Sequence, residues 1–149
     1  MSEEIYNRGV LDLAGNIPRI GRLANPDASA TAVSRLCGST VTVDLKLDGD
    51  AVSDYAHEVR ASALGQAAAS VLARNVLGAT AGELRAVRET MRRMLKEGGP
   101  PPEGRFGDLA ILETVRDYPP LQPSTMLTFD AVVDALDQIE SRRTLPPAA

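Results

Sequence analysis

The residue of this sequence best suited to chemistry is Cys37, because the chain contains no other cysteine. A cysteine thiolate is a strong nucleophile and a soft metal ligand, and it forms where nearby cations or a helix N-terminus lower the thiol pKa. Arg35 lies two residues before this cysteine, and Gly38 follows it directly. Two interpretations are open: Cys37 is a reactive or metal-binding thiol, or it is a small residue in a tight loop.

The other polar side chains supply no obvious partner for this thiol. His57 is the only histidine and has no cysteine or carboxylate at ligand spacing, so we expect it at the surface or on an edge strand. Ser62 and Ser124 each stand where a helix is predicted to begin, and serine is a favoured N-cap. Gly98 and Gly99 are followed by prolines, which lack the N–H groups of a phosphate-binding loop. Four aspartates are expected on a solvated face or in a turn: Asp44, Asp48, Asp50 and Asp54.

Alternating residues predict the strands that carry these side chains. Apolar and polar residues alternate from Val41 to Leu47, which is the period-two pattern of a half-buried strand. The turn Asp48–Asp50 contains Asp-Gly, which favours the positive φ of a tight hairpin. Val52–Val59 is expected to return as the partner strand, and Ala30–Leu36 is expected to form a further strand.

Helical spacing takes over after the hairpin. Apolar residues recur at this spacing from Ser62 to Val76, and Thr80 with Glu83 forms a capping box at the start of the next helix. The Gly- and Pro-rich segment near 98–105 is expected to be a flexible loop. Further helices are predicted at residues 3–13, at residues 107–115 and after residue 123.

Strands followed by a run of helices predict an α+β fold, an antiparallel sheet of about three strands with helices packed on one face. The length of 149 residues suits one domain, here residues 1–149, with a frayed C-terminal tail near 144–149. The net charge of −4 argues against a nucleic-acid partner. No apolar run approaches the roughly 18 residues of a membrane span, and the acidic N-terminus does not resemble a signal peptide. A single cysteine suits the reducing cytoplasm. No pattern in the sequence favours a monomer over an oligomer.

Three strings along the chain share a pattern with one known family. Residues 6–12, followed by Asn-Ile-Pro-Arg-Ile-Gly at 16–21, are similar to the family's opening helix and Asn-Pro-Arg-x-x-Gly segment, with one inserted isoleucine. Residues 37–38 match the first two residues of its Cys-Gly-Asp motif. Residues 106–110, Phe-Gly-Asp-Leu-Ala, follow a helical insert as in one branch. From about Tyr6 to Leu136 the chain therefore resembles the U-type iron–sulfur cluster scaffold family (NifU N-terminal domain, IscU and SufU), closest to the SufU branch.

The resemblance implies a ligand set that this sequence has mostly lost. Family members hold a transient cluster, or zinc in SufU, with three cysteines and an aspartate. Carried over by position, the first cysteine is Cys37, the aspartate falls at Ser39, and the other cysteines fall at Ser62 and Ser124. Pro123 stands where IscU members have histidine. Because a neutral serine hydroxyl is a poor ligand for these soft metals, we expect no bound zinc or iron–sulfur cluster, with Cys37 the only matching ligand.

Two hypotheses follow for the function. The first is an iron–sulfur cluster assembly scaffold-like protein with reduced or lost cluster and zinc binding. It would act through protein contacts or through sulfur acceptance at Cys37, with a cysteine desulfurase or another cluster-assembly protein as partner. The second is a non-enzymatic interaction or regulatory module that keeps the scaffold fold without metal. Neither of these makes the protein an enzyme, and we expect no enzyme activity; the remaining alternative is a metal-dependent enzyme whose ligands the sequence does not reveal.

Overall fold

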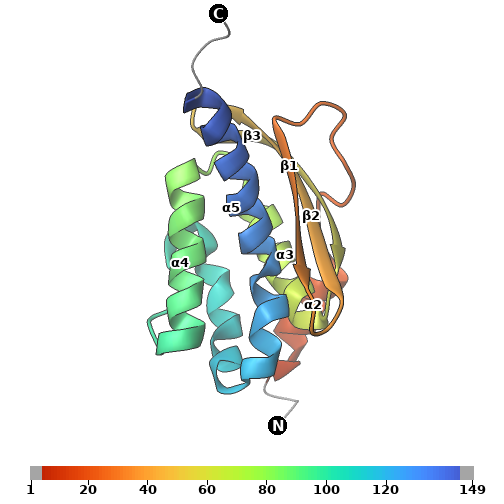
Figure 1. Cartoon of the computed structure of the whole chain (residues 1–149). Coiled ribbons are helices and arrows are strands. Elements are labelled where there is room, and N and C mark those ends of the chain that lie inside the picture. The colour runs from red at the N-terminus through yellow and green to blue at the C-terminus, as the bar shows by residue number, and fades with distance from the viewer. Residues whose placement is uncertain (1–4, 145–149) are drawn as a thin grey trace, which may run out of the picture.

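The computed structural model describes residues 5–144 of the chain, and it consists of one antiparallel sheet with helices against one face (Figure 1). The elements in chain order are α2 (Arg8–Gly15), β1 (Ala28–Ser34), β2 (Ser39–Asp48), β3 (Ala51–Arg60), α3 (Ala63–Asn75), α4 (Ala81–Glu97), the 3₁₀ helices η1 (Gly104–Asp117) and η2 (Pro119–Leu121), and α5 (Gln122–Thr144). This arrangement confirms the predicted α+β fold class.

The sheet has the order β1-β2-β3, and neighbouring strands are antiparallel throughout. The predicted hairpin is confirmed, since β2 and β3 pair from Thr40 opposite Arg60 to Asp48 opposite Ala51. Gly49 has φ 63° in the turn, the conformation that Asp-Gly favours. The first strand begins and ends two residues earlier than predicted, which places Leu36 in the hairpin loop between β1 and β2.

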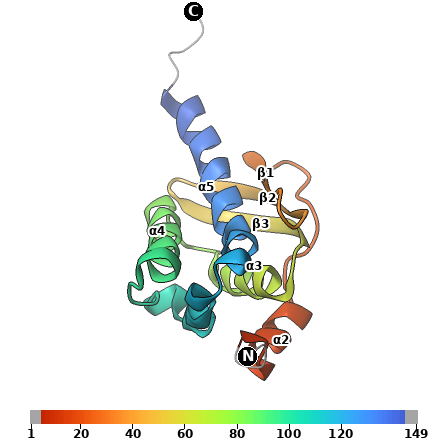
Figure 2. The ribbon, with the colours of Figure 1, turned by 60° about the horizontal axis from the view of Figure 1, so that its bottom comes forward.

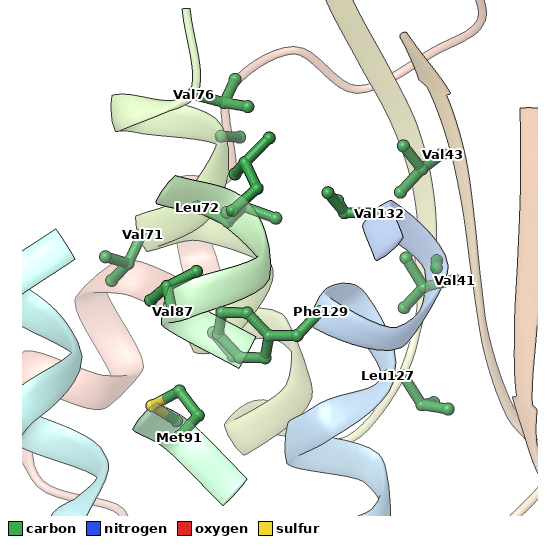
Figure 3. Close-up of a cluster of buried hydrophobic side chains, with 14 of the residues drawn as sticks. Val41, Val43, Val71, Leu72, Val76, Val87, Met91, Leu127, Phe129 and Val132 are labelled. Carbon is green, nitrogen blue, oxygen red and sulfur yellow. The ribbon is translucent and has the colours of Figure 1, made fainter. Parts of the chain in front are cut away.

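The core lies between the inner face of the sheet and three helices (Figure 3). Val41 and Val43 of β2 face α5, which supplies Leu127, Phe129 and Val132. The helices α3 and α4 close the other side of α5. Their apolar rows are confirmed as buried, and they include Val71, Leu72, Val87 and Met91. With few aromatic residues available, aliphatic and alanine side chains fill this space.

The outer face of the sheet is partly covered by the segment between α2 and β1, and this overturns one expectation (Figure 1). Asp44 was predicted on a solvated face, yet its side chain has no exposed surface. It accepts hydrogen bonds from Arg22, from the Leu23 backbone and from Ser29. The other three aspartates, Asp48, Asp50 and Asp54, are exposed as predicted.

Several helix boundaries differ from the prediction. The segment predicted as a short helix over 107–115 is a longer 3₁₀ helix, η1, and α5 begins at Gln122 rather than after residue 123. The first helix begins after Asn7, whose side chain caps it by accepting from the Val10 N–H. Residues 3–4 of the predicted first helix, and the tail from residue 145, lie outside the described residues. Residues 98–103 form an irregular connection, and their flexibility stays a prediction. Among residues 5–144, no helix is long and apolar enough to cross a membrane.

Candidate functional site

Cys37 lies in the hairpin loop that joins β1 to β2. Ser34 and Ser39 are the last paired residues of these strands and face each other at the base of the loop. Gly38 adopts φ 71°, a conformation open to glycine without strain, and its N–H donates to the Ser34 carbonyl at 2.8 Å. The turn therefore presents the Cys37 side chain, which is exposed, directly above the two serines.

Two buried hydroxyls contact the thiol. The Cys37 Sγ lies 3.3 Å from Ser34 Oγ and 3.0 Å from Ser39 Oγ. Both serines are only 6% exposed, so the strands hold these hydroxyls in place. The thiol donates to Ser34 Oγ. Side-chain hydrogen bonds with Ser34 and then Ser39 lower the pKa of the Cys37 thiol, because these hydroxyls donate to the sulfur once it is deprotonated and stabilise the thiolate. The sequence interpretation relied on Arg35 and missed Ser34, although the three-residue spacing across a tight turn could have indicated it.

A second pair of serines lies where two helices meet. Ser62 is the N-cap of α3, as predicted, and its Oγ accepts from the Gly65 N–H at 3.4 Å. Ser124 is not an N-cap, since it is the third residue of α5, and its hydroxyl is 2.8 Å from that of Ser62. A Cβ on Gly65 would come within 2.7 Å of the Ser124 carbonyl oxygen, so glycine permits this close approach. The two hydroxyls thus tie the start of α3 to α5.

The two serine pairs occupy the same end of the sheet. Thr40 pairs with Arg60, so Ser39 and Ser62 stand just beyond the paired ends of β2 and β3. Within residues 5–144, however, no hydrogen bond joins the thiol to the Ser62–Ser124 pair. The four positions that the resemblance assigned to one ligand set therefore lie at one end of the sheet, but they form two separate hydrogen-bonded groups.

These side chains do not fit a zinc ion or an iron–sulfur cluster. The four positions supply one thiol and three neutral hydroxyls, whereas zinc and iron–sulfur clusters are held by thiolates, imidazoles and carboxylates. Over the described part of the chain, no three His, Cys, Asp or Glu side chains converge into a metal-binding group. We therefore derive no chemical step through a bound metal.

His57 lies apart from this site. It is on β3, an edge strand of the sheet as expected, but its side chain is buried and not at the surface. It pairs with Val43, four residues along β2 from Ser39, so it does not approach the thiol. Its Nε2 is 2.8 Å from the Pro18 carbonyl oxygen, and its ring lies against Tyr55 with centroids 5.3 Å apart. Burial lowers the pKa of His57, and its Nδ1 has no hydrogen-bond partner among residues 5–144. These contacts connect His57 to Pro18, in the segment before β1, and to Tyr55 of its own strand.

Comparison with known proteins agrees with this architecture. The family model described as the NifU-like N terminal domain matches residues 5–125. The chain is 23% identical over 135 residues to the iron–sulfur cluster assembly scaffold protein IscU of Thermotoga maritima, covering 91% of this chain and 94% of that one.

Two solved structures are also similar. One is a nitrogen-fixing NifU-like protein (N-terminal) from Brucella abortus, with TM-score 0.93, 61% identity and coverage of 95% of this chain and 98% of that one. The other is a putative iron–sulfur cluster assembly scaffold protein, SufU, from Fervidobacterium islandicum, with TM-score 0.83, 24% identity and coverage of 91% and 99%. With the family model matching most of its length, this chain belongs to the family of NifU-like N-terminal domains.

Proposed function

We propose that this protein is a member of the iron–sulfur cluster assembly scaffold family that accepts sulfur at Cys37 and has reduced or lost cluster and zinc binding. The family match and the likeness to an IscU scaffold support the cluster-assembly part. The observation that carries the sulfur-accepting part is the exposed thiol held between the buried hydroxyls of Ser34 and Ser39. The hydrogen-bonded pair Ser62–Ser124 supports the loss of metal, because it replaces two family ligands with neutral groups.

The proposed step is a transfer of sulfane sulfur. The Cys37 thiolate attacks the outer sulfur of a persulfide on a donor protein, a new S–S bond forms at Cys37, and the donor's S–S bond breaks to release its thiolate. The Ser34 and Ser39 hydroxyls stabilise the attacking thiolate before transfer. No oxidant or metal is needed, since the donor persulfide already carries sulfur at the required oxidation level.

A cysteine desulfurase is the proposed donor, with other cluster-assembly proteins as receivers of the sulfur. The protein itself is proposed to act as a carrier rather than an enzyme, since its Cys37 sulfur is loaded and unloaded by partners. A reducing compartment such as the cytoplasm suits this role, because an exposed thiol is easily oxidised elsewhere.

The direct test is mass spectrometry after incubation with a cysteine desulfurase and free cysteine. We expect the intact protein to gain one sulfur atom, localised to Cys37 by peptide mapping and lost after treatment with a thiol reductant. The Cys37→Ser variant should gain none, and the Ser62→Ala variant should gain as much as the unaltered protein. If Cys37 stays unmodified while a three-cysteine scaffold accepts sulfur under the same conditions, the interaction-module function replaces this proposal.

Metal analysis of untagged protein tests the second half of the proposal. We expect zinc and iron far below one ion per chain, before and after reconstitution with excess metal under reducing conditions. Stoichiometric metal that is lost on Cys37→Ser would contradict the proposed loss of metal binding, and it would show that the hydroxyls act as ligands after all.

A further inference from the structure

One edge of the sheet is covered by other parts of the chain, and the other edge is open. At the β3 edge, the backbone of residues 19–21 bonds to His57, and the backbone of residues 78–79 bonds to Val52. Figure 2 shows β1 at the opposite edge, where no strand or bridge from residues 5–144 pairs with its outer side. Such an edge leaves N–H and C=O groups to which a further strand can bind.

The open part of β1 lies around Thr31 and Val33. At the start of the strand, the Gln138 side chain of α5 donates to the Ser29 carbonyl at 2.8 Å, so Ser29 directs its backbone groups to the free edge. Since these groups alternate between the two sides of a strand, those of Thr31 and Val33 also point to this edge. There they form no hydrogen bond with any residue in 5–144.

The sequence of β1 does not protect this open edge. Natural edge strands commonly carry a lysine, a proline or a bulge that prevents pairing with another chain. Residues 28–34 contain no charged residue and no proline, and they pair with β2 without a bulge. The side chain of Val33 is 56% exposed, and that of Leu36 just beyond the strand is 87% exposed. The edge is therefore suited to a partner strand.

Two charges without an ion pair stand near the ends of the open edge. Arg35 directly follows β1, is exposed, and forms no ion pair or hydrogen bond with the rest of residues 5–144. Asp134 stands one helical turn before Gln138 on α5, and it is also exposed and has no ion pair in that range. Partial desolvation and the carboxylates of Asp130 and Asp137 raise the pKa of Asp134, so a cation beside it would be favourable.

We propose that β1 pairs antiparallel with β1 of a second copy of this chain, with Thr31 opposite the partner subunit's Val33. In this two-fold register, the outward N–H and C=O groups of both residues meet their counterparts. Arg35 then lies opposite the partner subunit's Ser29, beside the turn of α5 that carries the partner's Asp134. The cation at one end of each edge thus meets the carboxylate at the other end of the facing edge.

A second copy fits this edge better than a strand of another protein for two reasons. Its charges are complementary to those of its own twin, and the pairing uses the only open edge of each sheet among residues 5–144. The assembly therefore closes at two chains instead of growing. Cys37 would lie opposite the partner subunit's Asp27, so the two thiols stay at opposite ends of the contact. The pairing does not depend on sulfur acceptance, and the two proposals can fail independently.

Light scattering of the reduced full chain over a range of concentrations tests the pairing. We expect the mass of two chains, falling to that of one on dilution. Val33→Pro removes an outward N–H that forms no bond within its own chain, and it should weaken association about tenfold or more. Val33→Thr keeps this N–H and the branched shape, and it should change association less than about threefold. Circular dichroism and thermal melting show whether each variant is folded.

Charge reversal tests the choice of a second copy. Arg35→Glu should weaken association about tenfold, because each end of the contact would then bring two carboxylates together. Combining Arg35→Glu with Asp134→Arg should restore it, since the pair is present again with its signs exchanged.

Disulfide formation tests the register in a Cys37→Ser background. Ala32→Cys would place two thiols directly opposite each other across the two-fold axis, at a Cα separation that a disulfide can span. Ala30→Cys is the matched control, because both alanines are 9% exposed on the same face of β1. Its two Cα atoms would lie roughly 13 Å apart along the paired strands, too far for a disulfide. We expect a covalent dimer after mild oxidation for Ala32→Cys alone.

Four results would overturn the proposal. The first is the mass of one chain at every concentration, which would leave the edge to a strand of another protein or to none. The second is an equal effect of Val33→Pro and Val33→Thr, and the third is no recovery when Asp134→Arg is added to Arg35→Glu. The fourth is equal disulfide formation in Ala30→Cys and Ala32→Cys, because the thiols would then meet by chance collision and not in a fixed register.

Discussion

Replacing Asp44 with alanine is expected to lower the free energy of unfolding by about 3 kcal/mol, because the buried carboxylate accepts four hydrogen bonds. Arg22 donates two of them, at 2.7 and 3.1 Å, while the Leu23 N–H and the Ser29 hydroxyl donate the others at 3.0 and 2.5 Å. A hydrogen bond to a charged group contributes roughly 1.5–3 kcal/mol to stability, and these contributions are not fully additive when one carboxylate accepts all of them. The Arg22 side chain is 51% exposed and regains water in the variant, so the cost falls at the low end of the roughly 3–5 kcal/mol known for broken buried ion pairs.

Urea unfolding followed by circular dichroism measures this loss, with an unchanged m-value as the sign that both proteins unfold in the same way. Asp44→Asn is the matched variant, since it keeps the shape and one acceptor oxygen but removes the charge, and about half the loss is expected. Burial raises the pKa of Asp44, but the hydrogen bonds from Arg22, Ser29 and Leu23 outweigh it and hold the pKa below the usual range of an aspartate. Since the folded pKa is depressed, the advantage over Asp44→Asn is complete above the unfolded pKa. It is lost as the pH falls through the lower pKa of the folded protein.

The prediction can fail in two ways. A loss below about 1 kcal/mol for Asp44→Ala would show that the segment between α2 and β1 does not depend on this carboxylate. A difference between the unaltered protein and Asp44→Asn that stays constant from neutral to strongly acidic pH would show that the charge itself contributes nothing to stability.

Three further changes test the packing near the site. Gly65→Ala should cost about 1–3 kcal/mol in urea unfolding, because its Cβ would meet the Ser124 carbonyl oxygen at 2.7 Å. A Cβ on Gly82 would lie 3.8 Å from Thr80 Oγ1, an ordinary contact, so Gly82→Ala should be neutral or stabilising. Joint replacement of Ser62 and Ser124 by cysteine puts two thiols where hydroxyls lie 2.8 Å apart. It should yield a disulfide in air, seen as the loss of two hydrogens by mass, and separate thiols in air would contradict this geometry. Because burial lowers the pKa of His57 in the folded state, stability should fall as the pH drops below the unfolded value of about 6.5. The urea midpoint should thus move less between pH 7 and pH 5 in His57→Gln, and equal shifts would refute this.

Local patterns were sufficient to predict the strands and most helices of this fold. The alternation from Val41 to Leu47 and the Asp-Gly turn after it determine the β2–β3 hairpin, because both signals lie within the paired residues themselves. The capping box at Thr80 and Glu83 is present with both hydrogen bonds. Such signals depend only on residues close together in the sequence, so they can be identified from a single amino-acid sequence.

Burial that depends on distant segments was not predictable in the same way. Alternation places Asp44 on the outer face correctly, but its cover comes from Arg22 and Leu23, which no periodic pattern assigns to the sheet. His57 is a different case. It stands two residues after Tyr55 in β3, so both side chains lie on the buried inner face, and the period-two pattern of this strand was visible in the sequence. The wrong prediction of an N-cap at Ser124 has a third cause: the 3₁₀ turn from Pro119 leads directly into α5, so the helix has already begun before Ser124.

The Ser62–Ser124 pair explains how a scaffold fold can remain ordered without a metal at this position. Metal ligands at such sites usually connect elements that would otherwise separate, and the binding energy then stabilises the fold. Here the hydrogen bond between Ser62 and Ser124, of roughly 1 kcal/mol, joins the start of α3 to α5, and the apolar contacts around Leu127 and Phe129 add to it. Under the proposed function, a Cys37 thiolate that holds no metal keeps its lone pairs for an incoming sulfur atom. The proposed loss of the metal ligands and the proposed sulfur acceptance at Cys37 are thus compatible in one structure, because the hydroxyls of Ser34 and Ser39 stabilise the thiolate charge.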